Sequence, residues 1–381
     1  MKAGVSFLFA NHDDWGRFEA QERGEDVPGR SAKPDDQVWR EELALGALVE
    51  PLGFDSLWTV EHHTTPYTMQ PNPLQLLAYF AGATTRIDFG TMVLVLPWHN
   101  PLRVAEDLTA LQNMIGPDRR IYAGVGRGAA RREFGSLQIP MGESRQRWVE
   151  SVEIIRKAIT EDRFTYDGKI FQLPETSLRP APVSTQVADD MHAAWGNPQT
   201  IPYAAELGLK PIIIPKKTWD EYAVELAEYG ALRAQHGFEP VQPIIAVSCY
   251  VHTDGEAGDK RAYQHFLEYG ESSLKHYELG GSHFADIPGY EAYRDNAAMY
   301  RDGAGKWADV FVKNNVWGSP EQVVAGIEEI RQKVNPSQFV FLLRFGSMSA
   351  ADGERNMRLF AEKVLPAVHA MPAGEPVAAA S

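Results

Sequence analysis

Short apolar runs alternate along the chain with longer segments in which apolar residues recur at helical spacing. The apolar runs predict eight strands, at residues 4–9, 56–60, 87–96, 120–125, 191–194, 211–214, 244–251 and 338–343. Strands that alternate with helices are typical of β/α units around a parallel sheet. Eight such units predict an α/β fold of the closed (β/α)8 TIM barrel type rather than an open doubly wound sheet.

Several helix starts are marked by an asparagine that precedes a proline. Asn72, Asn100 and Asn197 each stand where a side-chain amide can cap the helix, and the following proline has no N–H to leave unpaired. Ser319 begins a capping-box pattern, because Gln322 stands three residues later. These signals support helices that follow the expected strands.

Two segments interrupt the rhythm of strands and helices. Residues 11–33 form a polar stretch after the first strand, and residues 253–317 separate the seventh strand from its helix. Both leave the barrel at the C-terminal ends of strands, where barrel enzymes carry their active sites. We therefore expect insertion segments at the C-terminal face that act as a lid, with structural decoration as the alternative. A single barrel domain is expected over residues 1–370, followed by a disordered tail at 371–381.

The composition narrows the class of protein. Of 381 residues, 44% are hydrophobic and 23% are charged, and the formal net charge of -14 argues against nucleic acid and anionic membranes as partners. No apolar run approaches the roughly 20 residues that span a bilayer, and the N-terminal run is short for a signal peptide. The single cysteine, Cys249, excludes an intramolecular disulfide. We therefore expect a cytoplasmic protein.

Two adjacent histidines follow the second expected strand. His62 and His63, preceded by Glu61, lie at the end of the barrel where catalytic residues gather. Adjacent strand residues point to opposite faces, so the two histidines cannot easily share the ligand set that zinc needs, and we expect no metal. A histidine here can move a proton near neutral pH. A simple hydrogen-bonded loop histidine is the alternative.

A glycine-rich loop follows the fourth expected strand. Residues 124–129 match the G-x-G-x-x-[GA] pattern of dinucleotide-binding folds, but no helix with an apolar stripe opens on these glycines. We expect instead that the glycines allow close approach to a ligand and that Arg127 binds an anion, with Arg145 as a second partner. Gly196, Asn197 and Thr200 begin a helix whose free N–H groups can bind phosphate, although simple capping by Asn197 would need the same residues.

Aromatic residues near strand ends suggest the walls of an apolar substrate pocket, although each one alone is more often part of a core. The residues expected there are Phe9, Trp15, His63, Tyr67, Trp98 and Trp195.

Nearly the whole chain resembles the bacterial luciferase-like flavin-dependent monooxygenases. The motifs that carry the resemblance are G-F-D-S-L-W at 53–58, E-H-H at 61–63, A-T-T-R-I at 83–87, G-T at 90–91, L-P-W-H-N-P-L-R-V-A-E-D at 96–107 and G-R-G at 126–128. The resemblance implies the barrel fold already expected. It also implies a cis peptide bond between Met92 and Val93, where the third strand would bend under the flavin ring.

The resemblance assigns roles to individual residues. His62 matches the catalytic histidine, and Arg127 the arginine that binds the flavin phosphate. The start of the helix at Gly196, Asn197 and Thr200 matches the phosphate-binding helix, and Arg145 a further phosphate contact. Some luciferases carry a reactive cysteine where this chain has Gly126. This departure argues against the luciferase aldehyde reaction and leaves the general chemistry intact.

The implied function is that of a two-component monooxygenase. A separate NAD(P)H-dependent flavin reductase would supply reduced FMN, and one atom of O2 would enter a small apolar or heteroaromatic substrate. The family commonly forms dimers through the helices after the second and third strands, so a homodimer or higher homo-oligomer is expected. A deazaflavin-dependent hydride-transfer enzyme is the alternative on the same fold, and Glu61 favours FMN over it. A non-catalytic flavin-binding barrel is a further alternative.

Overall fold

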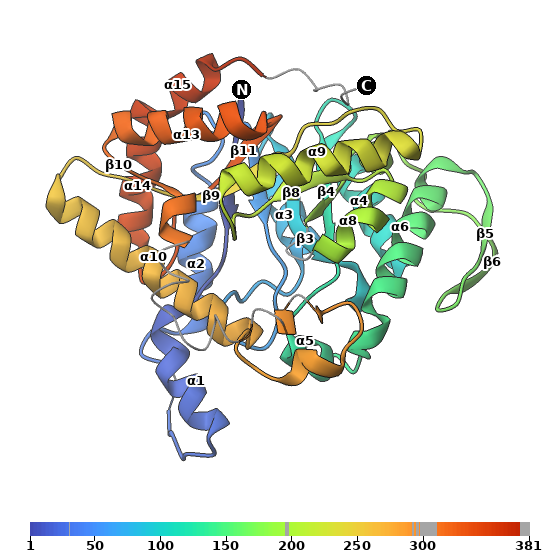
Figure 1. Ribbon diagram of the computed structural model, residues 1–381, viewed down its shortest axis with the longest axis horizontal. Helices are drawn as coiled ribbons and strands as arrows, with labels where there is room; N and C mark the ends of the chain where they lie inside the picture. The colour runs from blue at the N-terminus through green and yellow to red at the C-terminus, as the bar shows by residue number, and fades with distance from the viewer. Residues whose placement is uncertain (30, 195–197, 292, 295–296, 298–310, 374–381) are drawn as a thin grey trace.

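The computed structural model describes the whole chain except residues 30, 195–197, 292, 295–296, 298–310 and 374–381 (Figure 1). Trp195, Gly196 and Asn197 therefore lie outside the described residues, as does most of the tail that the sequence predicts to be disordered.

Eight parallel strands close into a barrel, with helices around it (Figure 1). Each strand pairs with its neighbours in the ring, and the pairing of β8 with β9 completes the closure. This confirms the predicted (β/α)8 barrel, and the predicted strands agree with the observed ones to within two residues at each end. The strands are, in ring order, β1 (Lys2–Phe7), β2 (Ser56–Thr59), β3 (Asp88–Val95), β4 (Ile121–Gly126), β7 (Met191–Ala194), β8 (Lys210–Ile213), β9 (Ile244–Val251) and β11 (Gln338–Leu342).

Three helices of the outer layer begin where the capping signals predict, and the fourth signal, at Asn197, lies outside the described residues. The side chains of Asn72 and Asn100 accept backbone N–H groups of α3 and α4, and Ser319 and Gln322 form the predicted capping box of α13. The outer helices are α2 (Asp35–Gly46), α3 (Pro73–Ala81), α4 (Pro101–Ile115), α6 (Ser144–Thr160), α7 (Gln186–Asp189), α8 (Ile201–Glu206), α9 (Trp219–Gln235), α13 (Pro320–Val334), α14 (Ala350–Lys363) and α15 (Leu365–Ala370).

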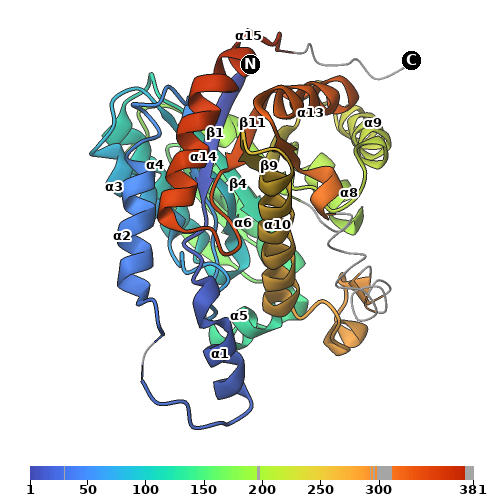
Figure 2. The same cartoon turned by 90° about the vertical axis from the view of Figure 1, so that its left-hand side faces the viewer.

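The two long segments contain more regular structure than a loop. The first holds the helix α1 (Trp15–Glu22), and the second begins with the 22-residue helix α10 (Glu256–Tyr277) and ends in β10 (Val316–Gly318), which pairs with β9. Figure 2 shows α10 running along one side of the barrel toward α1 and the short helix α5 (Arg131–Ser136). Both segments reach the C-terminal ends of the strands, and their role as a lid stays a prediction.

A buried tryptophan fills the interior of the barrel. Trp58 of β2 is fully buried, stacks on Tyr122 of β4 with ring centroids 5.5 Å apart, and donates a hydrogen bond of 2.8 Å to Ser56. Its ring fits because the neighbouring strands carry Gly4 and Gly90 beside it, and a Cβ at Gly90 would lie 2.3 Å from the ring.

Cys249 of β9 is fully buried too, and this burial raises the pKa of its thiol well above the usual value.

Charged residues close the N-terminal end of the barrel. Lys2 pairs with Asp88 at 2.8 Å, and Lys210 and Arg120 both pair with Asp190. His192 lies among them with its Nδ1 2.6 Å from the backbone oxygen of Asp190. Burial, helped by the nearby Lys210, lowers the pKa of His192 to about 4. These charged groups therefore satisfy one another at this end of the barrel.

Substitution of Gly90 by alanine should destabilise the barrel, because the new Cβ would overlap the buried ring of Trp58. Overpacking of this kind costs about 1–3 kcal/mol. Gly230→Ala is the matched control: a Cβ there would have no heavy atom within 4 Å, and the substitution lies inside α9. It should stabilise the helix by about 0.5–1 kcal/mol. Urea unfolding measures both effects, and equal stability of the two variants would contradict the packing account.

Candidate functional site

Two adjoining cavities open at the C-terminal ends of the strands. The first is lined mainly from the ends of β3 and β4 and from α5, and the second from the ends of β1, β9 and β11 and from α10. Five residues line both cavities and mark their junction: His62, Met92, Ile214, Lys216 and Tyr277. The peptide bond between Met92 and Val93 is cis, as the sequence resemblance predicts.

The first cavity brings together many of the residues singled out in the sequence. Its lining includes His62, Met92, Trp98, Arg127 and Thr200, which come from separate stretches of the chain. The second cavity is walled mainly by apolar and aromatic side chains, among them Tyr67, Tyr269 and Phe311.

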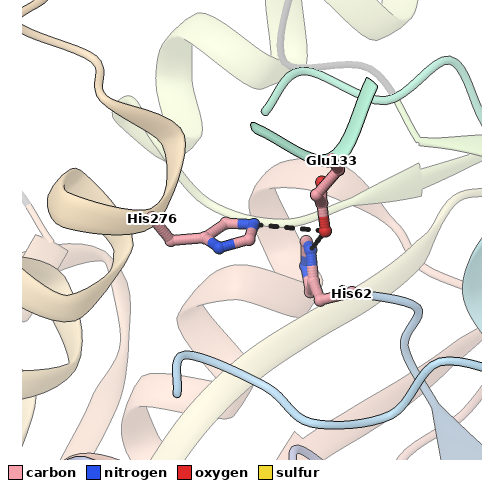
Figure 3. A group of neighbouring side chains, drawn as sticks. All are labelled: His62, Glu133 and His276. Atoms are coloured by element: carbon pink, nitrogen blue, oxygen red, sulfur yellow. Dashed lines mark hydrogen bonds and ion pairs between the residues drawn. The ribbon is translucent and has the colours of Figure 1, made fainter. Parts of the chain in front are cut away.

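A buried carboxylate joins three segments of the chain at His62 (Figure 3). Oε1 of Glu133, on α5, lies 3.0 Å from Nδ1 of His62 and 3.4 Å from Nε2 of His276, and it accepts the backbone N–H of His63 at 2.8 Å. On the other side of the His62 ring, the hydroxyl of Tyr277 lies 3.1 Å from Nε2. Both ring nitrogens of His62 therefore have a protein partner.

The electrostatics of this group follow from its burial. Burial opposes the ionisation of Glu133, but the neighbouring His62 and His276 outweigh it and lower the pKa of Glu133 to about 2. Burial lowers the pKa of His276 to about 4. Desolvation raises the pKa of Tyr277 well above its usual value. Near neutral pH this predicts an ionised Glu133, a neutral His276 and a protonated Tyr277 phenol.

His63 belongs to a second carboxylate. Its Nε2 lies 3.2 Å from Oε1 of the fully buried Glu61, and Nε2 of His99 lies 2.6 Å from the same oxygen. The other oxygen of Glu61 accepts the backbone N–H of Val95 at 2.7 Å. Burial alone would raise the pKa of Glu61, but the bonds from His63 and His99 hold it below its usual value. The adjacent histidines thus point to different partners, as expected of the strand end.

His62, Glu133 and His276 also offer one metal-ligand atom each within 4.8 Å. A bound ion would require the three atoms to converge on a shared centre. Here both histidine nitrogens approach the same oxygen of Glu133, which already accepts the N–H of His63. The geometry is therefore that of a carboxylate surrounded by donors. The sequence argument about metals weighed only His62 with His63 and did not foresee this grouping.

Arg127 lines the first cavity, and a second arginine, Arg145, lies beside it without lining the cavity. Arg127 is buried, its guanidinium lies 4.5 Å over the ring of Tyr290, and its Nη2 donates 2.8 Å to the backbone oxygen of Gly289. A Cβ at Gly289 would lie within 2.8 Å of both Arg127 and Arg145, so the two cations are neighbours. Burial, to which Arg145 adds, lowers the pKa of Arg127.

This pair has capacity left for an anion. Nη1 of Arg127 and Nε of Arg145 are buried and have no hydrogen-bond partner among the described residues. Thr200, at the start of α8, is buried and lines the same cavity. Buried guanidinium N–H groups without partners are costly, and a phosphate oxygen would satisfy them. The arrangement fits the terminal phosphate of a flavin nucleotide.

Phe9 and Trp15 do not belong to the walls of these cavities, which corrects the sequence interpretation. Phe9 has a φ of 54°, and its fully buried ring packs on Trp39 of α2 at 4.5 Å. Trp15 donates 2.6 Å to Ser272 of α10. Both are packing residues because the chain turns away from the barrel after β1. His63 lines neither cavity and packs on Trp98 at 5.1 Å.

Sequence reasoning missed Glu133, His276 and Tyr277. No spacing links them to His62, since 71 residues separate His62 from Glu133 and 215 separate it from Tyr277. The one available signal was an acidic residue close behind the glycine-rich loop. The pair His276 and Tyr277 closes α10, inside the long segment noted only for its aromatic residues.

The model of the luciferase-like monooxygenase family matches residues 9–335. The alkanal monooxygenase alpha chain of Photobacterium leiognathi is 27% identical over 350 residues, covering 89% of this chain and 95% of that protein. The oxygenase component of the flavin-dependent trigonelline monooxygenase of Acinetobacter baylyi is 27% identical over 192 residues, covering 50% of this chain and 52% of that protein.

Solved structures share the fold along nearly the whole chain. Monooxygenase RslO1 of Streptomyces bottropensis superposes with a TM-score of 0.72 at 24% identity, covering 96% of this chain and 99% of that one. The oxygenating constituent of 3,6-diketocamphane monooxygenase of Pseudomonas putida, in complex with FMN, gives 0.67 at 18% identity, covering 96% and 98%. An F420-dependent secondary alcohol dehydrogenase gives 0.63 at 19% identity, covering 96% and 98%. These identities show a common fold.

In the part of the chain that the structure describes, no helix combines the length and the hydropathy needed to cross a membrane.

The stability of the protein should fall in mild acid because two histidines are buried as neutral groups. The pKa values of His276 and His192 are lowered to about 4, against about 6.5 in an unfolded chain. The unfolded chain therefore binds the protons more readily, and stability is lost as the pH falls from about 6.5 to about 4. Glu133, with its pKa lowered to about 2, keeps its contribution above pH 4.5 and loses it only toward pH 2.

Each histidine should lower the free energy of unfolding by about 2 kcal/mol between pH 7 and pH 5. Urea unfolding at both pH values measures the loss, and His276→Phe should remove about half of it while His192 accounts for the rest. Stability between pH 7.5 and pH 8.5 serves as the control, because both groups are neutral throughout that range. A wild-type stability that stays constant from pH 7 to pH 5 would contradict the buried neutral state.

Proposed function

The chain belongs to the luciferase-like monooxygenase family and is a flavin-dependent monooxygenase, and from this premise we propose that it works as the oxygenase component of a two-component system. In this proposal it binds reduced FMN supplied by a separate NAD(P)H-dependent reductase and transfers one atom of O2 to a small apolar or heteroaromatic substrate. The FMN complex of one structural neighbour and the oxygenase-component relative support the cofactor and the reductase.

The observation that carries the proposal is the layout of the first cavity. Arg127 lines this cavity, with Arg145 beside it, and both carry N–H groups without a partner among the described residues. His62 lines the same cavity where the second cavity adjoins it. Arg127, Arg145 and Thr200 would hold the FMN phosphate, together with Gly196 and Asn197. Met92 and His62 would contact the flavin ring, which supplies the electrons and reacts with oxygen.

The second cavity would hold the substrate. Its largely apolar walls favour a neutral or weakly polar molecule, and Tyr67 and Tyr269 supply its aromatic surface. The segments at 11–33 and 253–317 would close over it and exclude water, which strengthens every electrostatic interaction inside.

Tyr79 of α3 and Met114 of α4 are 58% and 64% exposed, and they fit a homodimer interface on these helices. A cytoplasmic location fits the supply of reduced flavin.

A substrate panel with reduced cofactor tests the proposal. The protein is mixed with chemically reduced FMN, O2 and small apolar or heteroaromatic compounds, and products that carry one added oxygen are sought by mass spectrometry. A parallel arm offers reduced deazaflavin without O2 and follows hydride transfer. Oxygenated product with FMN alone supports the proposal, whereas turnover only in the deazaflavin arm would replace it with the hydride-transfer alternative.

Arg127→Ala should weaken the binding of reduced FMN. A hydrogen bond from a charged group contributes about 1.5–3 kcal/mol, or about 10- to 150-fold in affinity. Anaerobic titration with reduced FMN measures the dissociation constant. Arg163→Ala is the matched control, because Arg163 is exposed and pairs with Glu175 on the hairpin of β5 (Phe164–Asp167) and β6 (Gln172–Thr176). An unchanged dissociation constant in Arg127→Ala would remove the phosphate assignment.

His62→Ala should keep the fold and bind FMN but lose productive oxygenation. Loss of general acid–base help costs about 10²- to 10⁴-fold, and the electrons of the reduced flavin should then appear as hydrogen peroxide. The measurement is oxygenated product and released peroxide for each reduced FMN consumed. His63→Ala should be milder, since His63 faces Glu61 and Trp98. An inactive His63→Ala beside a normally coupled His62→Ala would reverse the assignment.

A further inference from the structure

We propose that Tyr277 is a catalytic residue, the last member of a hydrogen-bonded triad of Tyr277, His62 and Glu133 that delivers a proton to the junction of the two cavities. The inference rests on the proposed function, because it concerns the proton that oxygenation consumes at this site. It goes beyond the proposed function, which gives the acid–base role to His62 alone.

The positions of the ring nitrogens lead to this assignment. Nδ1 of His62 lies 3.0 Å from Oε1 of Glu133, and Nε2 lies 3.1 Å from the hydroxyl of Tyr277. A carboxylate can only accept, so Nδ1 carries a proton and, in the neutral ring, Nε2 accepts from Tyr277. With both nitrogens engaged, a proton on His62 reaches the cavities through the hydroxyl of Tyr277.

The surroundings hold the ring in this orientation. His276 packs edge-on against His62 with centroids 4.6 Å apart, and Tyr67 does so at 5.0 Å. Nδ1 of His276 lies 2.7 Å from the hydroxyl of Thr65, which fixes the ring of His276 in turn. Packed rings on two sides therefore hold the imidazole of His62 in place, as catalytic groups need in order to keep their geometry.

Glu133 contributes a charge as well as a position. Its carboxylate is buried, and its low pKa keeps it ionised at every working pH. A buried negative charge in contact with Nδ1 stabilises the imidazolium, as the carboxylate does in a Ser-His-Asp triad. In our proposal Glu133 is a positioning residue, since it acts through His62 and not on the substrate.

Tyr277 is placed to touch both ligands. It lines both cavities and belongs to the five residues at their junction. Desolvation keeps its phenol protonated, so it acts as a donor. Because it lies at the end of α10, the long segment at 253–317 supplies the group that completes the site.

The proposed step moves protons only. Oxygenation with O2 leaves one oxygen atom as water, and the two electrons come from the reduced flavin. Of the two protons in that water, one would come with the electrons of the reduced flavin and Tyr277 would supply the other. As the bond between the two oxygen atoms breaks, the O–H bond of Tyr277 would break and a new O–H bond would form on the oxygen that leaves as water. The step starts from protonated His62, whose Nε2–H donates to the Tyr277 oxygen and leaves the phenol proton free for the cavity. The Nε2 proton then restores the Tyr277 hydroxyl, and the Nδ1 proton stays on His62, hydrogen-bonded to Glu133. Solvent reprotonates His62 after product release.

The first test needs no cofactor. Nitrogen-15 NMR of histidine-labelled protein assigns the tautomer of His62, identified by the signal lost in His62→Gln. When the ring is neutral, we expect the Nδ1–H tautomer with a hydrogen-bonded Nε2. In Tyr277→Phe the Nε2 resonance should move toward that of an acceptor without a partner, while Nδ1–H is kept. An Nε2–H tautomer in the wild-type protein would overturn the triad, whatever the enzyme proves to catalyse.

The second test measures coupling. Tyr277→Phe should lower oxygenated product by about 10²-fold or more and raise peroxide, with the affinity for reduced FMN changed less than threefold. Tyr263→Phe is the matched control, since Tyr263 lies on the same helix and is 41% exposed. Normal coupling in Tyr277→Phe would overturn the proposal and leave His62 as the direct donor.

Glu133→Gln separates charge from position. The amide oxygen can still accept from His62 and from the backbone of His63, so a purely structural role predicts near-normal coupling. The proposal predicts a loss of tenfold or more with the Nδ1–H tautomer retained in the NMR spectrum. If the wild-type protein shows the predicted tautomer but oxygenates nothing in the substrate panel, the proposed function fails while the triad geometry stands. Normal coupling in Glu133→Gln would overturn the charge role.

Discussion

Two buried carboxylates organise the catalytic end of this barrel. An ionised carboxylate removed from water is tolerated only when donors surround it, and Glu61 and Glu133 each draw donors from several segments. Glu61 joins His63 and His99 to the end of β3 through Val95. Glu133 joins the strand end at His62 to α5 and α10. Loss of either side chain would leave a set of buried donors without an acceptor, so the shape of the first cavity depends on both.

Because each carboxylate holds a different histidine, the neighbouring residues His62 and His63 can differ in role. In the segment that follows β2, His62 lines the cavities while His63 packs on Trp98. Each ring is then fixed by its own carboxylate. Arg127, which lines the same cavity, and its neighbour Arg145 make the opposite arrangement: each has a buried N–H group without a partner among the described residues. In our proposal the cavity therefore joins a site for an anion to a group that donates a proton.

The barrel and one half of the site could be predicted from the sequence, because they depend on local patterns. Apolar periodicity located the strands, and His62 and Arg127 lie within short motifs at strand ends. Glu133 and Tyr277 could not be found in this way, since contacts across 71 and 215 residues exist only after the barrel closes. The misplacement of Phe9 and Trp15 has a related cause: position near a strand end does not say which way the chain turns afterwards.

The single thiol of Cys249 can report how often the folded barrel opens. The side chain is fully buried in β9, and its raised pKa keeps it in the unreactive protonated form. A thiol reagent can therefore label the protein only when the barrel opens around β9. The labelling rate, followed by mass spectrometry, would report how often the barrel opens there under native conditions. The same readout would show whether a bound flavin slows that opening, without any engineered probe.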